Sequence, residues 1–82
     1  MVITNEQLEK QFRDIAEIEY VKATGDGYHY QLIVVSDLFV GKSKVARQQW
    51  VYGVLNKHIL SGELHAIQMQ TMTKSEWETQ HG

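Results

Sequence analysis

The sequence predicts an α+β domain in which helices pack on a three-stranded mixed sheet. Segments with apolar residues at helical spacing alternate along the chain with segments rich in β-branched and aromatic residues. Two predicted strands flank a glycine-rich turn, and a long helical segment separates the second strand from the third. With that segment counted as two helices, the predicted order is αββααβα, and it fills residues 1–82 as a single domain.

The first helix is predicted in the segment "ITNEQLEKQFRDIAEI". Thr4 can cap this helix, and Gln7 stands three residues further on, where it completes a capping box. The apolar positions within the segment recur at the spacing of one helix face: Leu8, Phe12 and Ile15.

A hairpin of two strands is predicted after the first helix. Residues 18–23 and 28–36 are rich in side chains that favour strands. The letters "TGDG" lie between them, and glycine and aspartate tolerate the backbone conformations of tight turns. The two strands are therefore expected to run antiparallel.

The second half of the chain predicts a helix, a strand and a final helix. Ser43 can cap the helical segment at 44–60, in which Gly53 costs about 1 kcal/mol relative to alanine and is a candidate break. Residues 64–72 alternate in polarity as a strand does. The letters "TKSE" form a second capping box, and Trp77 is the expected core anchor of the final helix.

The composition limits the kinds of site that the chain can build. It contains no cysteine, so it can supply neither a disulfide nor a thiolate ligand. Its net charge of −2 does not attract nucleic acid. No apolar run approaches the roughly 18 residues of a membrane helix, and the N-terminal residues turn polar at once. We expect a cytoplasmic protein without a membrane partner.

The order of the elements brings three potential metal ligands to one end of the sheet. A strand–helix–strand connection normally returns parallel, so the third strand should start beside the start of the second. His65, at the head of the third strand, is then expected near His29 and near the turn that carries Asp26. Imidazole is a common ligand of iron and zinc. The alternative interpretation of His65 is a partly buried histidine with one hydrogen-bonded nitrogen.

Enzyme motifs do not occur in the sequence. No serine is paired with a base in a recognisable pattern, and no phosphate-binding glycine loop or carboxylate pair of assignable role is present. We expect a non-enzymatic protein.

Several short motifs, taken in order, carry a resemblance to a known family. A strand that ends in "VS" at Ser36 precedes "FVG", and a helix rich in basic residues and glutamine leads to "VY". The sequence "HA" begins at His65, and a late T-x-x-E-W ends at Trp77. In this combination the chain resembles the BolA-like proteins, and among them the short-loop bacterial YrbA/IbaG subfamily.

The resemblance implies a fold related to the type II KH domain and a role in iron–sulfur chemistry. BolA-like proteins pair with monothiol glutaredoxins and share a [2Fe–2S] cluster, for which the glutaredoxin supplies its cysteine and a glutathione thiolate. The family's histidine ligand corresponds to His65, and a second ligand often comes from the hairpin loop. Here that loop carries Asp26 where some relatives have cysteine, and a carboxylate is a harder ligand. The second ligand is therefore Asp26, His29 or a group from outside this chain.

The resemblance also raises a second function, a stress-response transcriptional regulator that binds nucleic acid as KH-like proteins do. The chain has no GXXG loop, the element by which KH domains clamp a nucleic-acid backbone. Lys42, Lys44 and Arg47 would supply the phosphate contacts to DNA, although such a group is also typical of a solvated helix start. Without a partner, the domain is expected to be a monomer.

Overall fold

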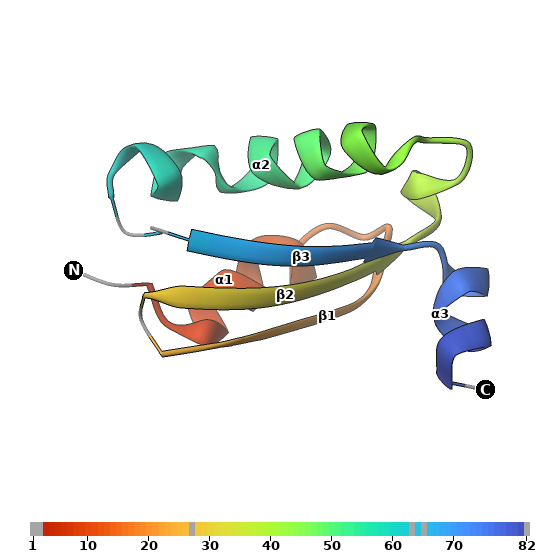
Figure 1. Ribbon diagram of the computed structural model, residues 1–82, viewed down its shortest axis with the longest axis horizontal. Coiled ribbons are helices and arrows are strands. Elements are labelled where there is room, and N and C mark those ends of the chain that lie inside the picture. The colour runs from red at the N-terminus through yellow and green to blue at the C-terminus, as the bar shows by residue number, and fades with distance from the viewer. Residues whose placement is uncertain (1–2, 27, 63, 65, 82) are drawn as a thin grey trace.

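The computed structural model describes residues 3–26, 28–62, 64 and 66–81 (Figure 1). The elements follow the predicted order. They are, from the N-terminus, α1 (Asn5–Arg13), β1 (Ile18–Gly25), β2 (His29–Ser36), a 3₁₀ turn (Asp37–Phe39), α2 (Lys44–Leu60), β3 (Ala66–Met72) and α3 (Lys74–His81).

The three strands form one mixed sheet in the order β1-β2-β3. β1 and β2 pair antiparallel, as the glycine-rich turn predicts, and β2 and β3 pair parallel, as the helical connection predicts. In this register His29 at the start of β2 lies opposite Ala66 at the start of β3. Both strands therefore begin at the same end of the sheet.

The hydrophobic core lies between one face of the sheet and the helices α1 and α2. In Figure 1, α1 lies behind the strands, α2 runs alongside β3, and α3 lies beyond the end of β3. α1 and α2 meet at Phe12 and Trp50, whose ring centroids lie 6.3 Å apart. The buried side chains that the sheet contributes to this core all point to one face: Val21, Ala23, Tyr30, Leu32 and Val34. The opposite face is left largely uncovered.

The first helix begins as predicted and ends earlier than predicted. The side chain of Thr4 accepts a hydrogen bond from the Gln7 N–H, and the Gln7 side chain accepts one from the Thr4 N–H, so the capping box is present. The helix stops at Arg13 because the N–H of Ile15 bonds to the carbonyl of Phe12, only three residues back. This tightened turn redirects the chain into β1.

The long helix α2 is continuous, so the predicted break at Gly53 is wrong. Val51 and Leu55, on either side of the glycine, are fully buried, and their packing outweighs the low helix propensity of one residue. Gly53 itself lies on the exposed side. Two helical segments do lie between β2 and β3, but the first of them is the short 3₁₀ turn at Asp37–Phe39, ahead of α2.

The final helix has its predicted cap, whereas Trp77 does not anchor it in the core. The Glu76 side chain accepts from the Thr73 N–H at 2.8 Å, and the Thr73 hydroxyl accepts from the Glu76 N–H at 3.2 Å. Trp77 is only half-buried and stacks on the exposed Tyr20, with ring centroids 4.8 Å apart. α3 lies at the end of the sheet, where the core does not reach.

Candidate functional site

The parallel pairing of β2 and β3 creates the end of the sheet at which the sequence places potential ligands. The hairpin turn with Asp26, the first residue of β2, His29, and the first residue of β3, Ala66, all lie there. His65 lies outside the described residues, so its side chain is not placed. The structure thus brings Asp26 and His29 together and fixes the position at which the chain enters β3.

Asp26 shapes the hairpin turn through its side chain. Its Oδ1 atom accepts hydrogen bonds from the N–H groups of Tyr28 and His29, each at 2.9 Å. These bonds, that from His29 first, lower the pKa of the Asp26 carboxyl because they favour its charged form. The carboxylate is exposed and ionised at neutral pH. One of its oxygens is engaged in the turn, which reduces its capacity to act as a metal ligand.

His29 presents its imidazole on the uncovered face of the sheet. The residue is exposed and borders a hollow of about 230 Å³. Across the hollow, the neighbouring strand contributes Ala66 and Gln68. A small residue opposite the histidine leaves room for a bulky group or a partner surface to approach it.

The described residues hold no group of three or more histidine, aspartate or glutamate side chains arranged around a metal ion. A metal or cluster at this end would need ligands beyond those of the described residues, and no cysteine can come from this chain. An imidazole fits such a shared site, since histidine ligates one iron of Rieske-type [2Fe–2S] clusters.

Sequence reasoning placed Gly25 in the turn and Tyr30 in the second strand, but it missed the contacts by which both residues support this end of the sheet. A Cβ atom on Gly25 would lie 2.7 Å from the carbonyl oxygen of His29, and equally close to the ring of Tyr30, so only glycine fits there. The buried Tyr30 donates its hydroxyl proton to the carbonyl of Ile3, at 2.5 Å, and thereby ties β2 to the N-terminal segment. Burial raises the pKa of the Tyr30 phenol, with a smaller contribution from the charge of Asp26.

The basic residues near the start of α2 divide into two kinds. Lys42 and Lys44 are exposed. The Arg47 side chain is 14% exposed and forms an ion pair with Glu76 on α3, at 2.7 Å. The same guanidinium donates to the backbone carbonyls of Lys42 and Thr71. Arg47 therefore braces α2, β3 and α3 against one another.

The fold is that of a small α+β protein with three helices and one three-stranded mixed sheet. The family model "BolA-like protein" matches residues 3–76. The chain belongs to the BolA-like family.

Individual relatives agree with this assignment. The chain is 36% identical over 73 residues to the acid stress protein IbaG of Escherichia coli K12, covering 89% of this chain and 87% of IbaG. It is 25% identical over 87 residues to the DNA-binding transcriptional regulator BolA of the same organism, covering 94% of this chain and 82% of BolA. A BolA homologue from Coxiella burnetii superimposes with a TM-score of 0.82 at 28% identity, covering 94% of this chain and 99% of the homologue.

No helix in the described part of the chain is both long enough and apolar enough to cross a membrane.

Proposed function

We propose that this protein is a non-enzymatic adaptor that pairs with a monothiol glutaredoxin and shares a [2Fe–2S] cluster with it, in iron–sulfur trafficking or sensing. Membership of the BolA-like family supports the proposal. The observation that carries it is the parallel register of β2 and β3, which gathers Asp26, His29 and the head of β3 at one exposed end. We also propose that the protein works in the cytoplasm, as a monomer until its partner binds.

The roles of the residues follow from their chemistry. The partner and glutathione supply the thiolates, because the chain has none. His65 supplies an imidazole to one iron. His29 is the better second ligand, because one oxygen of Asp26 is engaged with two backbone N–H groups. Replacing a thiolate by imidazole removes negative charge from the cluster, which raises its reduction potential.

The proposal is tested by reconstitution. The purified protein is mixed with a monothiol glutaredoxin, glutathione, iron and sulfide, and visible absorption and circular dichroism are compared with those of glutaredoxin reconstituted alone. A spectrum that differs from that of the glutaredoxin cluster supports a shared site. An identical spectrum at every ratio of the two proteins would reject it.

A second candidate function is nucleic-acid binding, which the name of one relative raises. Lys42 and Lys44 are exposed and are suited to phosphate contacts. Arg47 is largely buried in contacts with α3 and β3, so the predicted basic group is reduced to two lysines. Binding to a DNA duplex that weakens with rising salt and is lost in the double Lys42→Ala, Lys44→Ala variant would support this function.

A further inference from the structure

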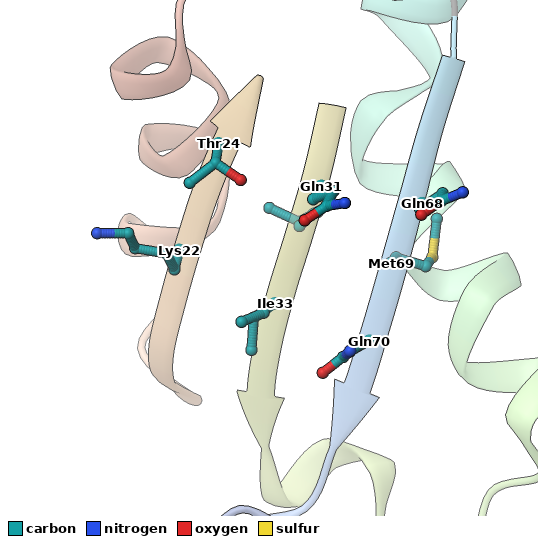
Figure 2. A pocket seen from close by; sticks show the side chains of 8 residues that line it. Lys22, Thr24, Gln31, Ile33, Gln68, Met69 and Gln70 are labelled. Atoms are coloured by element: carbon teal, nitrogen blue, oxygen red, sulfur yellow. The ribbon is translucent and has the colours of Figure 1, made fainter. Parts of the chain in front are cut away.

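The uncovered face of the sheet has an unusual composition for a surface exposed to solvent. The two rows that run across the strands in its middle are Lys22–Ile33–Gln70 and Thr24–Gln31–Gln68. Figure 2 shows these six side chains distributed over β1, β2 and β3. These side chains form a hollow of about 410 Å³, and Lys22 is the only charged residue among the described residues that line it.

The polar groups of this face are not used within the described structure. The side chains of Lys22, Gln31, Gln68 and Gln70 form no hydrogen bond or ion pair with the described residues. Each glutamine amide offers two N–H donors and one carbonyl acceptor, and these can pair with the carbonyl and the single N–H of a peptide bond. Depletion of charge is characteristic of the central part of protein interfaces.

The hollow extends along the strands toward the end that carries His29. The smaller hollow beside His29 shares Gln31 and Gln68 with it. The result is an elongated surface that follows the direction of β2, with an aliphatic side chain, Ile33, near one end. A linear ligand matches this shape better than a compact one.

Some backbone groups at the two edges of the sheet are already hydrogen-bonded to side chains. A partner is therefore expected to bind on the uncovered face and not as an added strand at an edge. On β1 the N–H of Ala23 donates to the buried carboxylate of Glu9, at 2.9 Å. On β3 the carbonyl of Thr71 accepts from Arg47, at 3.3 Å. Side chains on α1 and α2 thus take up backbone groups with which an added strand would have to pair.

We propose that this face, from Lys22 to His29, binds an extended segment of a partner protein that carries one carboxylate. The carboxylate pairs with the Lys22 ammonium, the peptide groups exchange hydrogen bonds with the three glutamine amides, and an apolar side chain packs on Ile33. This occupant matches the single positive charge and the amide lining.

The test is a titration followed by ¹⁵N–¹H NMR, in which the side-chain NH₂ signals of Gln31, Gln68 and Gln70 report directly on the face. The probes are four capped tetra-alanine peptides, each with one glutamate at a successive position. We expect saturable shifts of these signals for at least one peptide. Replacing its glutamate by glutamine should weaken binding about threefold, because an exposed charge pair is lost.

The matched variants are Lys22→Gln and Lys44→Gln, which remove the same charge from two exposed lysines. Lys22→Gln should weaken binding of the acidic peptide to the level of the glutamine peptide, and Lys44→Gln should leave it unchanged. An absence of saturable shifts for all four peptides at millimolar concentration would overturn the proposal. Equal effects of the two variants would also overturn it. Shifts that depend on protein concentration without peptide would assign the face to a second copy of the chain.

Discussion

Arg47→Met tests the contacts by which one arginine joins α3 to the rest of the fold. The substitution keeps an unbranched apolar side chain beside the Phe39 ring, over which the guanidinium lies at 5.9 Å. It removes the ion pair with Glu76 and the hydrogen bonds to the carbonyls of Thr71 and Lys42.

The loss of stability expected for Arg47→Met depends on how exposed each group that contacts Arg47 is. The Thr71 residue is buried, so its carbonyl loses a partner that water replaces poorly, at about 1 kcal/mol. The Glu76 side chain is 49% exposed and the Lys42 residue is exposed, so water replaces much of what Arg47 provides to them. The loss of each of these two interactions should therefore cost only about 0.5 kcal/mol. We expect the free energy of unfolding to fall by about 2 kcal/mol.

Urea denaturation followed by tryptophan fluorescence measures this change, and the midpoint should fall by about 1 to 2 M. The matched control is Lys44→Met, on the exposed start of the same helix, which should change stability by less than about 0.5 kcal/mol. Equal midpoints for Arg47→Met and the natural chain would refute the reasoning that Arg47 braces α3.

The same ion pair has a defined pH dependence. The Arg47 guanidinium and the Thr73 N–H lower the pKa of the Glu76 carboxyl in the folded protein below its ordinary value of 4.5. A lowered folded-state pKa gives stability that is fully present above the unfolded value and is lost as pH falls through the folded value. The stability difference between the natural chain and Glu76→Gln should therefore be constant near neutral pH and shrink below about pH 4.5. A difference that grows on acidification would contradict the assignment.

Three further substitutions test the hairpin end and the β1 edge. Gly25→Ala should destabilise the protein by about 1–3 kcal/mol, measured by thermal unfolding, because its methyl group meets the His29 carbonyl and the ring of Tyr30. Glu9→Ala should lower the free energy of unfolding, measured in urea, by about 1–3 kcal/mol, because it leaves the buried N–H of Ala23 without its acceptor. Glu6→Ala, on the exposed side of α1, is the control and should have little effect. If His29 is the second ligand, His29→Ala should alter the absorption of the reconstituted cluster more than Asp26→Asn does. Asp26→Asn keeps an acceptor oxygen for the hydrogen bonds of the turn. A larger effect of Asp26→Asn would assign the second ligand to Asp26.

Local patterns predicted the elements of this fold because each signal acts over a few residues. The capping boxes at Thr4 and Thr73 and the cap at Ser43 all form as the sequence predicts. The parallel return of β3 followed from the helical connection between the second and third strands, and it located the end of the sheet at which Asp26 and His29 meet.

Features that depend on contacts distant in sequence could not be predicted. The role of Arg47 requires Glu76, which is 29 residues away and belongs to another helix. The requirement for Gly25 depends on how closely β2 returns past the turn. Continuity of α2 through Gly53 depends on the burial of Val51 and Leu55, which the helical pattern alone does not quantify.

The central claim is that His65 completes a cluster begun by a glutaredoxin, and one comparison tests it most directly. His65→Ala and His81→Ala each remove one histidine, the second from α3, which lies beyond the opposite end of β3 (Figure 1). Both variants are first shown by far-ultraviolet circular dichroism to keep the fold. They are then reconstituted with the glutaredoxin, glutathione, iron and sulfide. The account predicts that His65→Ala loses the spectrum of the mixed cluster and that His81→Ala retains it. An unchanged spectrum in His65→Ala would contradict the account.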